Sequence, residues 1–321
     1  MPQTTTVSNT DANRNSKMSK TKIWINSLRL FTLPISLAGI IMGTLLAASY
    51  GKFSLLVFIF SLLTTACLHL LCNVANDYGD AIRNNDVGDR FGEVYVRYVQ
   101  DGLLSLQEVK KMIIYLTIAS CVFGALMIFF AFGWTIKLPH IIFFALGGFA
   151  VYGAIAYTNG KKPYGYKALG DLSVFIFFGI ATVAGSFILQ TSNFELSILL
   201  PAAALGMPIV GLLNNNNIRD LETDIKAGKI TIAYKLGLKG ARIYQFILLS
   251  LTFILSSIYV VLHYSSIFQW LFLLALIPFA KYAIGIYKSK TEVEYRIQEN
   301  FIPICVLIFS ILYGIGFYVG A

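Results

Sequence analysis

Long apolar runs, separated by short polar segments, follow one another along most of this chain. A bilayer core of about 30 Å needs roughly 20 apolar residues in each helix that crosses it. Nine runs meet that length: residues 27–48, 53–73, 112–132, 139–158, 171–190, 196–214, 242–262, 266–287 and 300–320. The pattern therefore predicts an all-α membrane protein with nine transmembrane helices.

The N-terminal residues differ from the rest of the chain. Residues 1–22 are mostly polar and lack periodicity, so we expect a disordered cytoplasmic tail. The apolar run that follows is too long for the core of a cleavable signal peptide, and no small-residue cleavage site stands out after it. We therefore expect a single membrane domain, residues 23–321.

Composition supports the membrane assignment. Of the 321 residues, 57% are hydrophobic and only 13% are charged, whereas soluble domains carry about a quarter charged residues. The four cysteines lie in or beside apolar runs and have no Cys-x-x-Cys partner. Neither a disulfide framework nor a zinc site is indicated.

Lysine and arginine are distributed unevenly between the two sides of the predicted bundle. With the N-terminus in the cytoplasm, the outer loops hold only Lys52 and Lys137, and the basic residues of the other loops lie inside. This positive-inside bias predicts a multi-pass membrane protein with its long polar segments in the cytoplasm. The bias also accounts for the net charge of +9, so no nucleic-acid partner is indicated.

Two long polar segments follow the second and the sixth predicted helix and share a pattern. Asn76 and Asp80 are four residues apart, and Asn216 and Asp220 repeat that spacing 140 residues later. Four helices separate the two segments. The repetition suggests two similar halves of four helices each, followed by a ninth helix.

Each polar segment carries two carboxylates at helical spacing. Asp77 and Asp80 form the first pair, Asp220 and Asp224 the second, and like charges at this spacing repel. Mg²⁺ binds carboxylate oxygens and keeps open positions for phosphate oxygens. Two Mg²⁺ bridged by a diphosphate group would therefore relieve the repulsion, and nearby basic residues could bind the remaining oxygens: Arg83, Arg90, Arg219 and Lys229.

A solvated interfacial loop is the simpler interpretation of either polar segment alone. Acids near a membrane are costly and usually functional, and the same pattern stands at equivalent places in both halves. These two observations favour function. We therefore expect the polar run from Asn214 to Asp224 to line a metal–diphosphate site at the cytoplasmic end of the bundle.

The two segments resemble a known family. "NDYGDAIRNNDVGDR" and "NNIRDLETDIKAGKITIAYKLG" are similar to the two aspartate-rich motifs of the UbiA superfamily of intramembrane aromatic prenyltransferases. Within it, "AYTNGKKPYGYKALGDLSVFIFFG", residues 156–179, resembles a loop of the enzymes that prenylate 1,4-dihydroxy-2-naphthoate. The resemblance covers roughly residues 25–320.

The resemblance implies a fold and a reaction. The fold is nine helices around a central cavity that opens sideways to the lipid bilayer. The reaction uses Mg²⁺ to ionise a polyprenyl diphosphate, and the resulting allylic cation is attacked by an electron-rich aromatic ring. In the naphthoate enzymes the prenyl chain replaces the carboxyl group, CO₂ and diphosphate leave, and demethylmenaquinone is the product of this step of menaquinone synthesis.

Site residues carry over position by position. The implied metal ligands are Asp77, Asp80, Asp86, Asp89, Asp220 and Asp224, and the implied diphosphate contacts are Arg83, Arg90, Arg219, Lys229 and Lys162. The residues implied to be catalytic are Asn76, Asp80, Asn216, Asp220 and Tyr157. Tyr157, like Tyr164 and Tyr166, is a candidate for shaping the cavity or shielding the cation, and structural packing stays open as an alternative for each.

The sequence departs from the family pattern at two places. Asn84 stands where many members have a third acid, so Asp86 or Asp89 must substitute for it. "FGEVYVRYVQDG" replaces a Gly-Pro-Leu-Arg-like segment, and Arg97 is the candidate for the missing arginine. These departures bear on the choice of acceptor more than on prenyl transfer.

Other functions fit part of the pattern. A related enzyme would use 4-hydroxybenzoate, homogentisate, haem or chlorophyllide as the acceptor. A secondary transporter also contains internal repeats and intramembrane acids, but it places them in broken helices near the midplane. Here the acids stand at helix ends on one side, which favours the enzyme.

Overall fold

The computed structural model describes residues 19–84, 99, 102–160, 163–226 and 228–321. Within these ranges nine stretches are helical, long and apolar enough to cross a membrane: Lys20–Ser49, Leu55–Ile82, Leu106–Phe132, Leu138–Ala156, Gly170–Thr191, Leu196–Arg219, Ile232–Leu262, Ile267–Lys288 and Glu292–Val319. Each coincides with one predicted run, so the all-α class and the nine spans are confirmed.

The spans are assembled from long helices and short irregular turns. The α-helices are α2 (Lys20–Ser27), α3 (Leu33–Ser49), α4 (Leu55–Asn84), α5 (Leu106–Phe132), α6 (Leu138–Ala156), α7 (Gly170–Val174), α8 (Ala181–Thr191), α9 (Leu199–Arg219), α10 (Leu221–Lys226), α11 (Ile232–Leu262), α12 (Leu276–Lys288) and α13 (Glu292–Val319). A π-helical segment, Phe175–Ile180, joins α7 to α8, and 3-10 turns cover Leu30–Thr32, Tyr164–Tyr166, Leu196–Ile198 and Ile267–Ala275.

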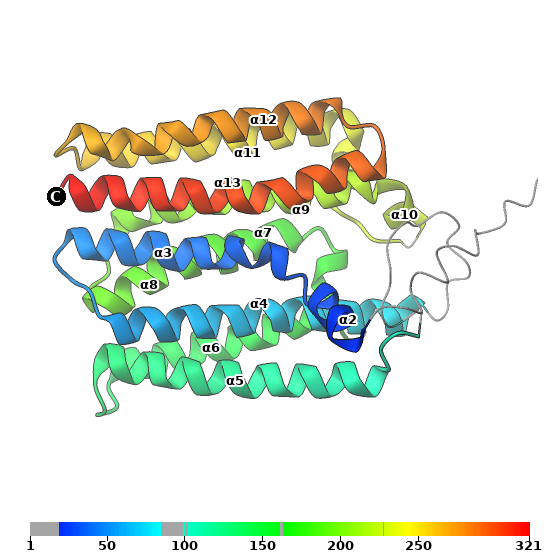
Figure 1. The fold of residues 1–321 in the computed structure, drawn as a ribbon, viewed down its shortest axis with the longest axis horizontal. Coiled ribbons are helices and arrows are strands. Elements are labelled where there is room, and N and C mark those ends of the chain that lie inside the picture. Colours follow the sequence, from blue (N-terminus) through cyan, green and yellow to red (C-terminus); the bar gives the residue numbers. More distant parts are fainter. Residues whose placement is uncertain (1–18, 85–98, 100–101, 161–162, 227) are drawn as a thin grey trace, which may run out of the picture.

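The long helices run side by side along the longest axis of the molecule (Figure 1). Helices α4, α5 and α6 form one side, α11 and α12 the other, with α3, α9 and α13 between them. We call the end that carries α2, α10 and the C-terminal turns of α4 the motif end. The C-terminus lies at the opposite end from α2, as an odd number of spans requires.

The polar segments begin as helix and not as loop. Helix α4 continues to Asn84 and α9 to Arg219, well beyond the apolar runs predicted from the sequence. On α4, Val74 and Ala81 lie two turns apart and are both almost fully buried, so its apolar face continues through the polar segment. Tertiary packing therefore keeps the first motif helical.

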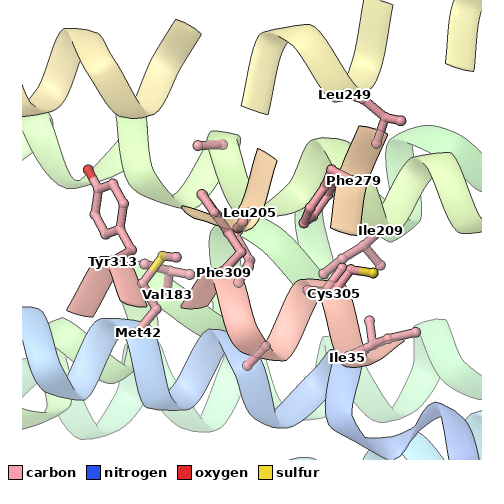
Figure 2. Close-up of a cluster of buried hydrophobic side chains, with 14 of the residues drawn as sticks. Ile35, Met42, Val183, Leu205, Ile209, Leu249, Phe279, Cys305, Phe309 and Tyr313 are labelled. Carbon is pink, nitrogen blue, oxygen red and sulfur yellow. The ribbon is translucent and has the colours of Figure 1, made fainter. Parts of the chain in front are cut away.

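The core is centred on α3, α9 and α13 (Figure 2). Phe309 of α13 contacts the rings of Phe272, Phe279 and Tyr313, with ring centroids 5.8 to 6.2 Å apart. The Ser310 hydroxyl donates to the Ala38 carbonyl of α3 at 2.6 Å. Membrane helices associate through such close packing and interhelical hydrogen bonds, because lipid is as apolar as the side chains themselves.

The outer helices present their apolar surface outward. Only 11% of the apolar window of α5, and the same share of α6, is buried within the protein, against 61% for the span that contains α9. Ile118, Ile141 and Phe149 are among the large exposed side chains. Apolar surface of this extent needs a lipid solvent, so the protein is a multi-pass membrane protein.

Candidate active site

The first motif lies on the last turns of α4. Asp77 accepts hydrogen bonds from Arg29 Nη2 at 2.6 Å and from Ser27 Oγ at 3.5 Å. Arg29 stands between α2 and the next turn with a left-handed backbone, φ 52°, a conformation that costs an L-residue roughly 1–2 kcal/mol. The tight turn after α2 therefore places the Arg29 guanidinium against Asp77 of the first motif.

Asn76 is held by the segment that follows α6. Thr158 Oγ1 donates to the Asn76 Oδ1 and to the Ala75 carbonyl, both at 3.2 Å. Asn159 Nδ2 donates to the same carbonyl at 2.8 Å. A Cβ at Gly79 would meet the Thr158 side chain at 2.6 Å, so glycine permits this close approach.

Asp80 is reached by the same segment a few residues later. The Tyr166 hydroxyl donates to Asp80 Oδ1 at 3.0 Å. The backbone around Tyr166 is fixed in turn, because Ile230 N donates to the Tyr166 carbonyl at 3.2 Å and Ala168 N donates to the Ile230 carbonyl at 2.8 Å. We call this pairing, which places Lys167 opposite Ile230, the loop bridge.

The second motif begins where α9 ends. Arg219 binds Asp220 through two hydrogen bonds, Nε to Oδ1 at 2.7 Å and Nη2 to Oδ2 at 2.8 Å, and its Nη1 pairs with Glu299 of α13. The Arg219 side chain is 10% exposed and that of Glu299 13%. Asp224, in α10, pairs with Lys229 at 3.1 Å.

The surroundings of Asp220 keep it ionised. Burial would raise the pKa of its carboxyl, but the hydrogen bonds and charge of Arg219, aided by Lys229 and Arg296, lower the pKa below its ordinary value. Charge-assisted bidentate pairs of this kind are among the stronger hydrogen bonds in proteins. A carboxylate in this form is ready to bind a cation.

The run of asparagines divides into two groups. Asn214 donates to the Ala241 carbonyl at 2.9 Å and to Gln245 Oε1 at 2.8 Å, and Asn215 donates to the Tyr295 carbonyl at 3.1 Å. Both side chains are fully buried and join α9 to α11 and α13. These bonds use the amide nitrogens only, because the Oδ1 atoms of both residues are buried and have no hydrogen-bond partner among the described residues. The expectation that the two asparagines line a metal site stays a prediction.

Asn216 differs in that its side chain is only partly buried. Its Oδ1, like those of Asn214 and Asn215, is buried and has no hydrogen-bond partner among the residues that the structure describes. Buried amide oxygens are normally satisfied, and this one stands one helical turn before Asp220, whose N–H donates to the Asn216 carbonyl at 2.9 Å. Asn216 therefore presents an available oxygen donor beside the second motif.

Two connections join the motifs into one site. Lys229 Nζ, which pairs with Asp224, also lies 5.9 Å from the centroid of the Tyr166 ring, and Tyr166 binds Asp80. Arg29, the partner of Asp77, acts electrostatically on Arg219. The pattern that the sequence repeats at a distance of 140 residues is thus brought together at the motif end.

The donor set fits Mg²⁺. Among the described residues no three His, Cys, Asp or Glu side chains form a ready-made metal cluster. Mg²⁺ bound with a phosphorylated substrate needs only one or two carboxylates, because water and phosphate oxygens complete its shell. Asp77 and Asp80 on one side, Asp220, Asp224 and the orphan Asn216 oxygen on the other, are donors of that kind.

Several predicted site residues lie outside this description. Asp86, Asp89, Arg90, Arg97 and Lys162 fall outside the described residues, and for Arg83 only the helical backbone is described. Their assignment as metal or diphosphate ligands stays a prediction.

The tyrosines of the 157–169 segment have different roles. The Tyr157 ring meets the Tyr164 ring edge-on at 5.3 Å, and burial raises the pKa of Tyr157 well above its usual value, so it stays a neutral phenol. Tyr164 donates to the Gly153 carbonyl at 2.8 Å, a packing role. Only Tyr166 reaches a motif carboxylate directly.

Sequence reasoning missed Arg29 and Glu299. Arg29 lies inside the first predicted run, and its charge there was the available signal, since a buried arginine needs an acidic partner. Glu299 is four residues from Pro303 at the start of the ninth helix. Its pairing with Arg219 spans 80 residues and leaves no local signature.

The described residues form nine candidate membrane spans and bring two carboxylate motifs to one end of the bundle. Comparison with known proteins gives this arrangement a family. The model of the UbiA prenyltransferase family matches residues 36–299. The chain belongs to that family. It is 39% identical to a 1,4-dihydroxy-2-naphthoate octaprenyltransferase of Haemophilus influenzae, over 96% of this chain and 100% of the relative.

Two further comparisons agree. The chain is 36% identical to a protein of the same name from Escherichia coli, over 94% of this chain and 97% of that one. Among solved structures, a UbiA homologue from Archaeoglobus fulgidus bound to GPP and Mg²⁺ superposes with a TM-score of 0.63 at 16% identity, covering 92% of this chain and 99% of the other. This last likeness shows the shared fold.

Proposed function

We propose that this protein transfers a polyprenyl group from a polyprenyl diphosphate to 1,4-dihydroxy-2-naphthoate, with loss of CO₂ and diphosphate, to give the aromatic quinol form of demethylmenaquinone. The observation that carries the proposal is the joining of two carboxylate motifs at one end of a membrane bundle through Tyr166 and Lys229. The naphthoate as acceptor is supported by end-to-end similarity to the two bacterial relatives of that name.

The bonds that change are few. The bond between carbon and oxygen at the head of the polyprenyl diphosphate breaks, and its electron pair leaves with the diphosphate. The ring carbon that carries the carboxylate forms the new carbon–carbon bond. The bond to the carboxylate then breaks, CO₂ leaves, and the electron pair of that bond restores the aromatic ring.

The chain supplies the binding and the environment. We assign Asp77, Asp80, Asp220 and Asp224 as the carboxylates that hold Mg²⁺, with Asn216 as a further oxygen donor. Bound there, Mg²⁺ neutralises the diphosphate as its bond to carbon breaks. Lys229 lies beside Asp224 and adds a positive charge for diphosphate oxygens.

The membrane setting suits both the donor and its cation. A polyprenyl tail gains about 0.8 kcal/mol for each CH₂ removed from water, so its enzyme belongs in a bilayer with the diphosphate near the surface. The aromatic faces of Tyr157 and Tyr166 can stabilise a nearby cation. We place the protein in a bacterial inner membrane with the motif end in the cytoplasm, on the strength of the lysine and arginine distribution.

The test uses membranes that contain the protein, a labelled polyprenyl diphosphate and 1,4-dihydroxy-2-naphthoate. We expect lipid-soluble product that disappears with EDTA, returns with Mg²⁺, and is lost in Asp80→Ala and Asp220→Ala. Glu195→Ala is the matched control, because Glu195 is an acid that binds the Tyr50 hydroxyl in a loop between spans, away from both motifs. Prenylation of another phenol but not the naphthoate would overturn the acceptor assignment, and no prenylation by folded protein would overturn the whole proposal.

A further inference from the structure

One buried carboxylate belongs to neither motif. Asp171 is 9% exposed and accepts a hydrogen bond from the Tyr244 hydroxyl at 3.0 Å. Within the described ranges no cation pairs with it. Tyr244 comes from α11, 73 residues further along the chain. Burying a carboxylate without a cation is costly. The position of Asp171 therefore indicates that it binds a further group.

Helix geometry explains only part of this position. Asp171 is in the first turn of α7, where the helix dipole favours an anion. An acid that served only this purpose would gain by staying in water, whereas Asp171 turns into the bundle. The helix after it is irregular, since Phe175–Ile180 is π-helical, a deviation that is frequent at functional sites.

Tyr157 places Asp171 next to the proposed site of prenyl transfer. A Cβ at Gly170, the residue before Asp171, would lie 2.8 Å from the Tyr157 hydroxyl oxygen, so the phenol packs directly on this backbone. Both Asp171 and Asp80 act electrostatically on Tyr157. Tyr157 therefore packs against the backbone next to Asp171 and lies within electrostatic range of Asp80 as well.

We propose that Asp171, oriented by Tyr244, accepts a hydrogen bond from a hydroxyl group of the aromatic acceptor. The inference rests on the proposed function and names the group that recognises the acceptor within the same site. The Tyr244 hydroxyl binds Oδ2. Within the described residues the carboxylate has one further polar contact, with its own backbone N–H, so it keeps capacity to receive the hydroxyl. Such a site selects phenols and naphthols over arenes that have no hydroxyl group.

The chemistry gives this hydrogen bond a purpose. When the ring carbon attacks the allylic cation, the hydroxyl oxygen donates electrons into the ring and its O–H becomes strongly acidic. An anionic acceptor beside that proton stabilises the charge as it develops. Loss of CO₂ returns an electron pair to the ring, and the proton stays on the hydroxyl oxygen, so no further reactant is needed.

The experiment is a thermodynamic cycle in which the Asp171 carboxylate and the acceptor hydroxyl groups are altered separately and together. Wild-type protein and Asp171→Asn are assayed with 1,4-dihydroxy-2-naphthoate and with its two mono-methyl ethers, each lacking one hydroxyl donor. With one of the two ethers, we expect the kcat/KM of the wild type to fall about 10- to 100-fold relative to the parent acceptor. With the parent acceptor, Asp171→Asn should fall below the wild type by a similar factor. Changing from the parent acceptor to that ether should then lower the kcat/KM of Asp171→Asn little further. Fully additive losses with both ethers would overturn the proposal.

Two further measurements separate recognition from folding. Tyr244→Phe should raise KM for the acceptor and leave Mg²⁺-dependent binding of the polyprenyl diphosphate unchanged, whereas a structural defect would weaken both. Tyr313→Phe is the control, since it removes a buried hydroxyl that has no hydrogen-bond partner within the described part of the chain. Weakened donor binding in Asp171→Asn and Tyr244→Phe alike would contradict the assignment.

The outcome also distinguishes this inference from the proposed function. If wild-type protein prenylates another phenol in place of the naphthoate, the same cycle is run with that phenol and its methyl ether. The acceptor assignment then fails while the role of Asp171 is still decided by non-additivity. If no arene is prenylated, the proposed function and the role of Asp171 fail together.

Discussion

The two carboxylate motifs lie at the same end of the bundle but are held by different parts of the chain. In the second motif, Asp220 is paired with its neighbour Arg219, and Asp224 with Lys229 five residues away. In the first, Asp77 is paired with Arg29, 48 residues earlier, and Asp80 with Tyr166, 86 residues later. The partners of the second motif are local, whereas the first motif depends on partners that only the folded chain brings to it.

This difference teaches where each motif is vulnerable. The first depends on the turn at Arg29 and on the loop bridge, both of which are set by backbone geometry. The second depends on one buried guanidinium shared by two carboxylates. Substitutions should therefore affect function at both motifs but stability mainly at the second.

The largest expected effect concerns the two motifs together. Asp80→Ala and Asp220→Ala should each lower kcat/KM by at least about 100-fold, because each removes a ligand from a site that acts as a unit. The double variant should lose little more than either single one, as is typical of groups that work together. Independent, multiplicative losses would show that the motifs do not share one diphosphate.

The next largest effect is expected on folding stability, which should fall more when the arginine of the second motif is removed than when that of the first is removed. Arg219→Ala leaves Glu299, whose side chain is only 13% exposed, without its cation, whereas Asp220, at 35%, can be hydrated. We therefore expect a cost of about 3 kcal/mol, the lower end of the range for breaking a buried pair. Arg29→Ala should cost less, since it leaves one carboxylate, Asp77, without its cation, whereas Arg219→Ala leaves two. Denaturation in detergent measures both, with Lys20→Ala, which removes an exposed ion pair with Glu108, as the mild control. Equal losses would contradict the contrast between the motifs.

A smaller effect is expected at the link between them. Tyr166→Phe removes the hydroxyl that binds Asp80 and keeps the ring beside Lys229. We expect activity to fall about 10-fold and the affinity for Mg²⁺ to weaken, which is the range for a residue that orients a metal ligand. The matched control is Tyr164→Phe, whose hydroxyl binds the Gly153 carbonyl. A similar loss in both variants would assign Tyr166 to packing.

The smallest effect is one of pH. The pKa of Asp220 is lowered on folding, so the stability it contributes is complete above the ordinary aspartate value of 3.8 and is lost as pH falls through the lowered value. The difference in melting temperature between wild type and Asp220→Asn should therefore be constant from pH 8 to pH 5 and shrink only below 3.8. A decline that begins near neutral pH would contradict the ionised state.

Much of the fold could be predicted from the sequence. Apolar run length alone located all nine spans, because the bilayer imposes one length on every helix that crosses it. The ends of the helices were harder to predict from the sequence. A prediction from apolar run length ends each helix at the first polar residues. In the structure, the packing of Val74 and Ala81 in the assembled bundle keeps α4 helical to Asn84.

The site was predictable in its residues but not in its connections. The repeated Asn–Asp spacing singled out Asp80 and Asp220, and the fold brings their motifs together. The pairing of Asp77 with Arg29 and of Arg219 with Glu299 depends on helix placement, which no local pattern encodes. The asparagine run shows the converse, because Asn214 and Asn216 have the same chemistry, and the phase of the helix decides that Asn214 binds α11 while Asn216 stays partly exposed one turn before Asp220.

The pairing of Arg219 with Glu299 has a consequence for biosynthesis. Helices leave the ribosome in chain order, so α13, the last of the described spans, inserts after both motifs have reached the membrane. Until it does, Arg219 lacks Glu299, and Asn215 lacks the Tyr295 carbonyl. A nascent or truncated chain therefore carries every motif aspartate without a finished site, and competence begins only when the ninth helix docks.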